Sequence, residues 1–107
     1  MTVKTLPSHL FGEHLQFTGP LPITPDLRIK AVDTNWVTGI YKDKWFQAKV
    51  FATPSTFGIK NGRVSKLCIS TSDKWMGMDH MLFNYDRGMD INHKMGRDLA
   101  AIFDKCI

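Results

Sequence analysis

The sequence predicts an α+β fold, in which an antiparallel sheet of four to five strands carries one C-terminal helix. Short runs rich in β-branched and aromatic residues, separated by turn residues, fill most of residues 27–86. An apolar pattern of helical spacing then closes the chain. A chain of 107 residues forms one domain with one modest core. We therefore predict a single domain over residues 1–107, with an irregular extension over residues 1–35 and a sheet-plus-helix core over residues 36–107.

The first third of the chain is the least regular. Ser8 is a candidate cap for a short helical turn, which Gly12 weakens. Residues 19–25 contain three prolines, which fix φ and remove amide donors. This proline-rich segment is therefore expected to run as an extended strap across the surface.

The middle of the chain predicts a series of strands. Residues 27–32 alternate apolar and basic side chains, and residues 36–41 are rich in β-formers. Residues 44–52 continue the sheet after a turn at Lys42-Asp43, with Phe46, Ala48, Val50 and Ala52 on the core side. Asn61-Gly62 predicts a β-hairpin between residues 57–59 and 63–70.

A methionine-rich loop over residues 71–80 leads to the last expected strand, residues 81–86. Gly88 is expected to allow a tight turn by an unusual φ. The helix is expected to begin near Asn92 or His93, with Asp90 or Asn92 as N-cap. The apolar positions of this helix are Met95, Leu99, Ile102, Phe103 and Cys106, and Lys105 suits its C-terminal dipole.

Charge and composition restrict the classes of function. The formal charge is +4, and residues 1–70 hold nine basic side chains against four acids, whereas residues 71–107 hold five against six. A basic sheet half permits an anionic partner without requiring one. The apolar runs are far shorter than the roughly 20 residues of a membrane helix, and no secretory signal is recognisable. We therefore expect a cytoplasmic protein without a membrane partner.

Three segments occur in a fixed order in the core: FQAKVF at residues 46–51, FGIKNGRVSKL at residues 57–67 and YDRGMDI at residues 85–91. Together with the closing helix, they resemble a family of small bacterial and phage proteins of unknown function. The resemblance spans about residues 36–107, with Met89 where that family is expected to have tryptophan. It implies the same fold and a phage or mobile-element setting, and it implies no activity.

The segment YDRGMD supports two interpretations. In the first, Asp86 or Asp90 accepts hydrogen bonds from turn or helix amides and Arg87 pairs with one of them, so that the segment is a structural joint. In the second, Arg87 groups with other basic residues into an anion- or partner-binding patch. The candidate residues of this patch are Lys49, Arg63, Lys66, Asp86, Arg87 and Asp90.

Catalytic and metal signatures are not found in the sequence. Asp86 and Asp90 are four residues apart, which permits an acid/base pair, but no nucleophile motif lies near them. The four histidines lack metal-binding spacing, and Cys68 and Cys106 form no C-x-x-C motif. We therefore expect no catalytic residue, no metal and no cofactor, and an enzyme site at Asp86, Arg87 and Asp90 stays an alternative.

The loop over residues 71–80 carries one tryptophan and several methionines. These side chains either fold back over the sheet edge or form an exposed apolar patch for a protein partner, with Trp75, Met76, Met78 and His80 as candidate contacts. Our leading hypothesis is a non-catalytic binding protein of phage or mobile-element type, in one form an inhibitor of a host or defence protein. The alternative is a nucleic-acid-binding module in which a basic sheet face and its aromatic residues contact single strands. The chain is expected to be a monomer or, through an exposed edge strand, a homodimer.

Overall fold

The structure is a computed structural model that describes residues 4–5 and 21–105 of the chain. The predicted turn at Ser8 and the first part of the proline-rich segment lie outside the described residues. Two short strands, β1 (Lys4–Thr5) and β2 (Pro22–Ile23), pair with each other. Thr24 then forms a bridge to Leu27, at which the main sheet begins.

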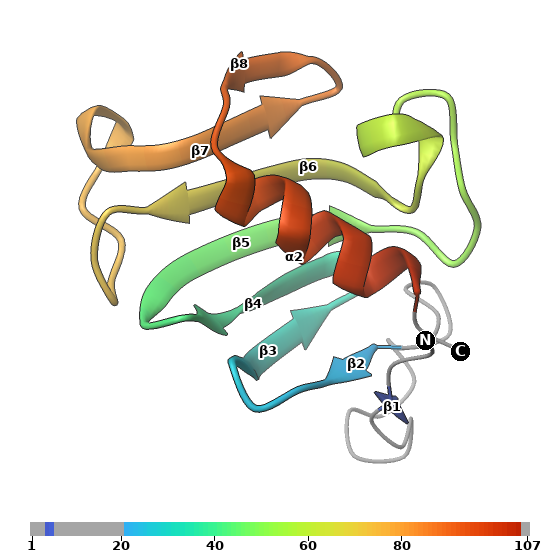
Figure 1. Ribbon diagram of the computed structural model, residues 1–107, viewed down its shortest axis with the longest axis horizontal. Helices are drawn as coiled ribbons and strands as arrows, with labels where there is room; N and C mark the ends of the chain where they lie inside the picture. The colour runs from blue at the N-terminus through green and yellow to red at the C-terminus, as the bar shows by residue number, and fades with distance from the viewer. Residues whose placement is uncertain (1–3, 6–20, 106–107) are drawn as a thin grey trace.

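Six antiparallel strands form one sheet, and each strand lies beside the next one in the sequence (Figure 1). The strands are β3 (Leu27–Asp33), β4 (Trp36–Tyr41), β5 (Lys44–Val50), β6 (Val64–Ser70), β7 (Met81–Asp86) and β8 (Met89–Ile91). The helix α2 (Lys94–Asp104) crosses one face of this sheet. The predicted α+β class and the single closing helix are thus confirmed, and the sheet has one strand more than expected.

The core lies between α2 and the sheet. Phe46, Phe83 and Phe103 are fully buried there, and the rings of Phe46 and Phe103 meet edge to face with centroids 6.2 Å apart. Gly96 brings the first turn of α2 directly onto the ring of Phe83, because a Cβ at this position would overlap that ring. Leu99 adds a further buried contact on the same helix face.

The start of α2 differs from the prediction. His93 is the N-cap, and its Nδ1 accepts a hydrogen bond from the Met95 backbone N–H at 3.0 Å. Asp90 cannot cap the helix because it lies in β8, and the Asn92 Oδ1 accepts a hydrogen bond from Arg97 Nη1 instead. The predicted caps at Asp90 and Asn92 were therefore wrong, although the helix begins close to the predicted position.

The turn after β7 also differs. Residues 86–89 close a tight β7–β8 hairpin, in which the positive φ of 57° belongs to Arg87 and not to Gly88. The Arg87 N–H donates to the Ser65 carbonyl at 3.0 Å, and this bond to β6 holds the turn in place. The predicted tight turn is thus present, but the unusual φ assigned to Gly88 was wrong, because β8, a three-residue strand without a clear apolar alternation, was not expected.

The predicted hairpin at Asn61-Gly62 was wrong. Residues 59–61 form a short 3₁₀ turn, in which Lys60 and Asn61 have positive φ values of 52° and 58°. Ile59 inserts into the core, so residues 57–59 do not extend into a strand that could pair with β6. Residues 51–63 form a compact loop instead, held by a hydrogen bond from the Ser55 N–H to the Gly62 carbonyl at 3.0 Å.

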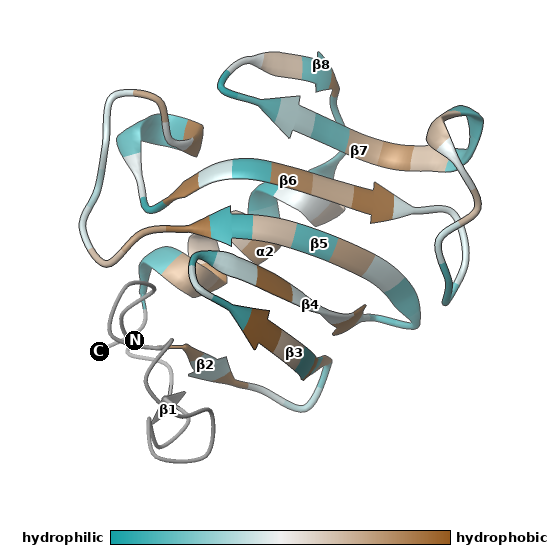
Figure 2. Cartoon of the chain, turned by 180° about the vertical axis from the view of Figure 1, so that it is seen from behind, coloured by the Kyte–Doolittle hydropathy of each residue, from teal (hydrophilic) through white to brown (hydrophobic). Residues whose placement is uncertain are grey.

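The sheet face opposite α2 has no layer over it in the described part of the chain. Figure 2 shows this face, with α2 behind the strands and with polar and apolar residues mixed along them. Trp36, Gln47, Lys49 and Lys66 are all partly exposed here. An antiparallel sheet commonly leaves one face to solvent, and here that face carries aromatic and basic side chains.

Candidate binding groove on the open sheet face

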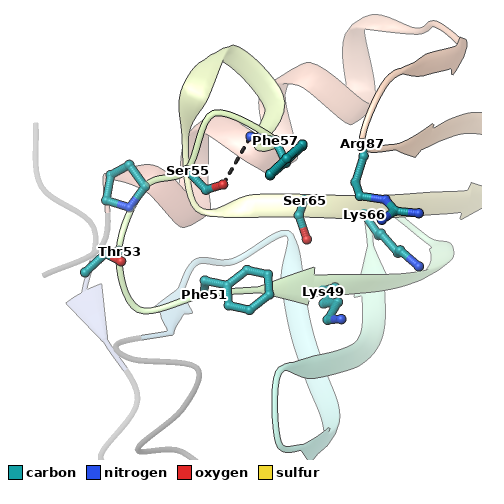
Figure 3. Close-up of a pocket in the computed structure, with 9 residues that line it drawn as sticks. Lys49, Phe51, Thr53, Ser55, Phe57, Ser65, Lys66 and Arg87 are labelled. Atoms are coloured by element: carbon teal, nitrogen blue, oxygen red, sulfur yellow. Dashed lines mark hydrogen bonds between the residues drawn. The ribbon is translucent and has the colours of Figure 1, made fainter.

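A groove with a volume of about 360 Å³ lies at one end of the open face (Figure 3). Three segments build it: the end of β5 with the loop that follows, the start of β6, and the β7–β8 turn. Its lining residues are Lys49, Phe51, Thr53, Pro54, Ser55, Phe57, Ser65, Lys66 and Arg87. We call it the basic groove, because its charged lining residues are two lysines and one arginine.

A β-bulge in β6 places the side chains of Ser65 and Lys66 in the lining of the basic groove. Lys49 lies opposite Lys66 and Val50 lies opposite Val64, so β6 has one extra residue, Ser65, between these pairs. Val64 is consequently buried under α2, whereas Lys66 lies on the open face. A regular strand would place Val64 and Lys66 on the same face, and this bulge places them on opposite faces.

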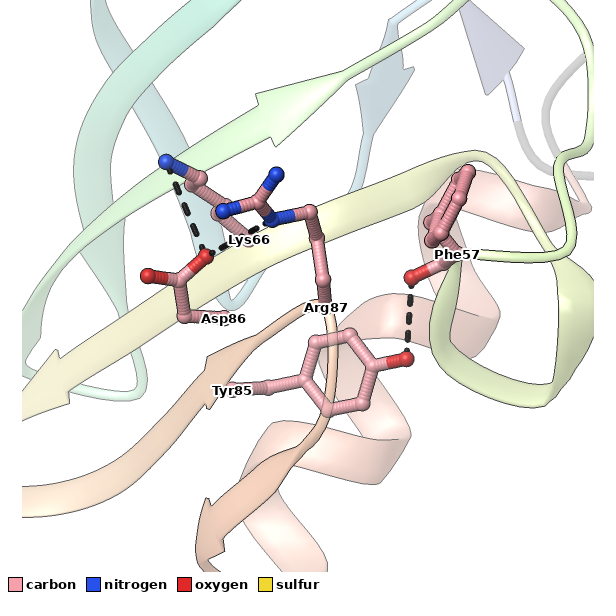
Figure 4. A network of polar contacts seen from close by, with 5 residues as sticks. All are labelled: Phe57, Lys66, Tyr85, Asp86 and Arg87. Carbon is pink, nitrogen blue, oxygen red and sulfur yellow. Dashed lines mark hydrogen bonds and ion pairs between the residues drawn. The ribbon is translucent and has the colours of Figure 1, made fainter.

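Phe57 is an exposed residue whose backbone is held by hydrogen bonds on both sides. Its N–H donates to Ser55 Oγ at 3.1 Å, and its carbonyl accepts from the Tyr85 hydroxyl at 2.9 Å (Figure 4). Gly58 follows it because the loop passes so close to Gly62 that a Cβ would overlap the Gly62 carbonyl. As a residue, Phe57 stays 60% exposed at the edge of the groove. Figure 3 shows Phe57 and Phe51 on opposite sides of Ser65.

The ammonium groups of the two lysines lie near aromatic rings. The Lys49 Nζ is 5.6 Å from the ring centroid of Phe51 and 5.7 Å from that of Trp36. The Lys66 Nζ is 5.8 Å from the Trp36 centroid. Cation–π contacts of this kind contribute about 0.5–1 kcal/mol at exposed sites. They hold both lysines over the sheet face instead of leaving them in bulk solvent.

Asp86 is the only acid in an ion pair with these cations in the described residues. Its Oδ1 lies 3.6 Å from Lys66 Nζ and 3.5 Å from Arg87 Nε (Figure 4). All three side chains are partly exposed, so each ion pair contributes at most about 1 kcal/mol. None of the ion pairs among the described residues involves Lys49. The groove therefore keeps a net positive charge.

The part of the chain that holds this groove identifies the family. A family model described as a domain of unknown function, DUF7678, matches residues 35–105. The chain belongs to this DUF7678 family. Every residue that lines the basic groove lies within the matched range. No curated protein and no solved structure matches the chain.

Two other residues of the predicted patch lie elsewhere in the DUF7678 domain. Arg63 is 5% exposed, and it donates from Nε to the Phe51 carbonyl at 2.8 Å and from Nη1 to the Phe103 carbonyl at 2.7 Å. Asp90 accepts a hydrogen bond from Asn84 Nδ2 at 3.0 Å on β8. The structure therefore brings Lys49, Lys66, Asp86 and Arg87 together, and it places Arg63 in the interior and Asp90 outside the groove lining.

The chemistry that the groove offers is binding through charge, hydrogen bonds and stacking. Asp86 and Asp90 have different partners, so they do not form one acid/base pair. Cys68 lies half-buried on the open face, and burial raises the pKa of its thiol, which keeps the thiol protonated near neutral pH. Within residues 4–5 and 21–105, no cluster of three or more histidine, cysteine or acidic side chains is suited to a metal ion.

The methionine-rich loop combines both predicted arrangements. Trp75 folds back onto Trp45, with ring centroids 5.3 Å apart, and still remains partly exposed. Met76 and Met78 are 44% and 66% exposed, and His80 is also exposed. In the described part of the domain, no helix is long and apolar enough to cross a membrane.

Sequence analysis did not identify Phe57, Ser55 and Ser65 as parts of a site. An exposed Phe57 is indistinguishable from a core phenylalanine in the sequence alone, because residues 57–59 resemble a strand. The usable signal was the pair of glycines at 58 and 62, which is typical of a close backbone approach as well as of a hairpin.

Proposed function

We propose that this DUF7678 domain is a non-catalytic binding protein whose basic groove binds a phosphate-bearing partner. The observation that carries this proposal is the convergence of Lys49, Lys66 and Arg87 with the rings of Phe51 and Phe57 on one hollow of the open face. Cations close to an anion in a partly enclosed site interact more strongly than they do in bulk water. Arginine also offers a planar donor fork that suits phosphate.

Asp86 fits this function as an internal counter-ion. Its two ion pairs are 3.5 and 3.6 Å long and lie at the surface, so breaking them costs little. A phosphate in the groove would replace the carboxylate beside Lys66 and Arg87 and would bring more charge and more acceptor atoms. Asp86 thus offsets part of the positive charge, and Lys66 and Arg87 remain available to a stronger anion.

Calorimetric titration with inorganic triphosphate at low ionic strength tests the proposal. We expect binding that weakens with added salt, and a several-fold loss of affinity in Lys66→Gln and in Arg87→Gln. Asp86→Asn should bind several-fold tighter, whereas Asp90→Asn, which removes the same charge outside the groove, should not. Lys74→Gln is the matched control for the lysine change, because Lys74 is exposed and does not line the groove.

Two outcomes would contradict this function. The first is an absence of triphosphate binding by the wild-type chain at low salt. The second is an equal loss of affinity in Lys66→Gln and Lys74→Gln, because only a diffuse charge effect produces it.

A protein partner is the second candidate, and the exposed Met76 and Met78 favour it. Methionine adapts its shape to varied surfaces, and exposed apolar patches are typical of protein-binding sites. Under this candidate the chain acts in a phage or mobile-element setting by binding, and in one form inhibiting, a host or defence protein. A host protein that the wild-type chain retains and a Met76→Ala/Met78→Ala variant does not would support it. Equal retention by both would contradict it.

A further inference from the structure

Aromatic rings and ammonium groups alternate along the open face. The Lys49 Nζ lies between two rings, 5.6 Å from the centroid of Phe51 and 5.7 Å from that of Trp36. The Lys66 Nζ lies on the same Trp36, at 5.8 Å. Phe57 lies across Ser65 from Phe51 at the edge of the groove. Flat stacking surfaces and positive charges are thus interleaved on one part of the open face.

The hollow does not end at the basic groove. A second, shallower hollow of about 130 Å³ shares Lys66 with the groove and reaches Trp36 and Gln47. A third hollow of about 230 Å³ shares Trp36 and Gln47 with the second and reaches Thr38 near the β3 side of the sheet. The three hollows share lining residues and lie one after another across β6, β5 and β4, and we treat them as one path. Amide and hydroxyl groups line this path, together with the carboxylates of Asp86 in the second hollow and Asp33 in the third.

From this path we infer that the partner of the groove is single-stranded nucleic acid, an inference that rests on the proposed function. A single strand presents unpaired bases that stack on aromatic rings and phosphates that contact lysines between them. A duplex hides the faces of its bases, and polyglutamate or an inorganic polyphosphate has no aromatic ring to stack on Phe51, Phe57 or Trp36. Gln47 and Thr38 contribute hydrogen-bonding groups along the same path.

The path is long enough to contact an oligonucleotide at more than one aromatic residue, which a mononucleotide cannot do. Phe51 and Phe57 line the groove, where we expect a first base to stack, and Trp36, on the other side of Lys49, is the expected site for a second. A chain of several nucleotides engages both, so affinity should rise from the mononucleotide to a short oligomer and then level off once the path is filled. Sequence preference should be weak, because every base has a π-face.

Fluorescence anisotropy with a labelled 12-nucleotide thymidylate oligomer tests the inference. The comparison ligands are an abasic oligomer with the same phosphates, a duplex of the same length, and polyglutamate as competitor. We expect the thymidylate oligomer to bind on the order of tenfold more tightly than the abasic one. Phe57→Leu should remove most of that difference without weakening the abasic oligomer, since only the ring is lost.

A matched control and the folded state complete the experiment. Met78→Leu changes a side chain of similar exposure outside the groove and should leave both affinities unchanged. Phe57 is 60% exposed, so Phe57→Leu should unfold at the wild-type temperature. Trp36→Leu is a second variant, expected to reduce thymidylate binding by a similar factor.

The outcomes separate this inference from the proposed function. Equal affinity for the thymidylate and abasic oligomers, tighter binding of the duplex, or equal competition by polyglutamate overturns single-strand recognition and leaves anion binding in the groove intact. Failure of both oligomers and of triphosphate to bind at low salt overturns the proposed function itself.

Discussion

The two faces of the sheet are made by the same strands and serve different purposes. On β5, Phe46, Ala48 and Val50 point under α2 and are fully buried, whereas Trp45, Gln47 and Lys49 alternate with them on the open face and are partly exposed. The covered face is built mainly from apolar side chains, with the Arg63 guanidinium buried near the end of α2, whereas the open face displays lysines beside aromatic rings. Because successive side chains of a strand point to opposite faces, β5 contributes one set of residues to the core and another to the proposed binding face.

The two arginines of the predicted patch show the same separation. Arg63 is buried, and its guanidinium donates to the carbonyls of Phe51 and Phe103. Arg87 is exposed in the β7–β8 turn, and its guanidinium lies against Asp86 at the groove. Arg63 therefore has a structural role in the interior, whereas Arg87 lines the groove that we propose as the binding site.

The largest expected effect comes from the covered face. Phe103→Ala removes a fully buried ring that meets Phe46 and should lower the free energy of unfolding by about 3–5 kcal/mol. Urea denaturation followed by circular dichroism measures this change. Under conditions where the variant is folded, its affinity for triphosphate should equal that of the wild type. A weakened affinity in the folded protein would show that the two faces are not independent.

The pair of arginines gives the next largest effect. Arg63→Met removes, among the described residues, the guanidinium hydrogen bonds to the Phe51 and Phe103 carbonyls and should cost about 3 kcal/mol of stability. Arg87→Met, the same change at the exposed position, should stay within about 0.5 kcal/mol of the wild type. Thermal unfolding of both variants measures the difference. Similar melting temperatures for the two variants would contradict the separate roles assigned to these arginines.

The sequence predicted the covered face well and the open face poorly, for physical reasons. Apolar periodicity predicts Leu99 and Phe103 on one helix face and Phe46 and Val50 on one strand face, because burial selects for it. A bulge such as that at Ser65 leaves no such pattern, since it changes register by one residue without changing composition. The grouping of Lys49 with Lys66 therefore depended on a strand register that only the structure supplies.

The loop over residues 51–63 illustrates the same limit. Asn61-Gly62 satisfies the local requirement for positive φ in a hairpin, and Asn61 does have a positive φ. Burial of Ile59 in the core outweighs strand pairing, so a 3₁₀ turn forms instead. Only the positive φ of Asn61 agrees with the predicted turn, since Gly62 has a φ of −96°, and the tertiary contact that selects among turns was not predicted.

The smallest expected effect concerns the outer surface of α2. Asp98 accepts a hydrogen bond from Lys94 Nζ at 2.7 Å, which lowers the pKa of its carboxyl. A lowered folded-state pKa means that the contribution to stability is present above the ordinary value of 3.8 and is lost as the pH falls below it. Because the pair is exposed, Asp98→Asn should cost no more than about 0.5 kcal/mol near neutral pH.

Unfolding of the wild type and Asp98→Asn at pH 7 and pH 3 measures this effect. The stability difference should shrink at pH 3, and triphosphate binding at pH 7 should not change. A change in binding would mean that charges on the covered side influence the groove.

The guanidinium of Arg63 also connects the end of α2 to the loop that forms the groove. It donates hydrogen bonds both to the Phe103 carbonyl in the last turn of α2 and to the Phe51 carbonyl at the groove. The Asp104 carboxylate accepts a further hydrogen bond from the Arg63 backbone N–H at 2.8 Å. The last turn of α2 and residues 51–63 are therefore expected to open as one unit, so that their backbone amides should show similar protection from hydrogen exchange.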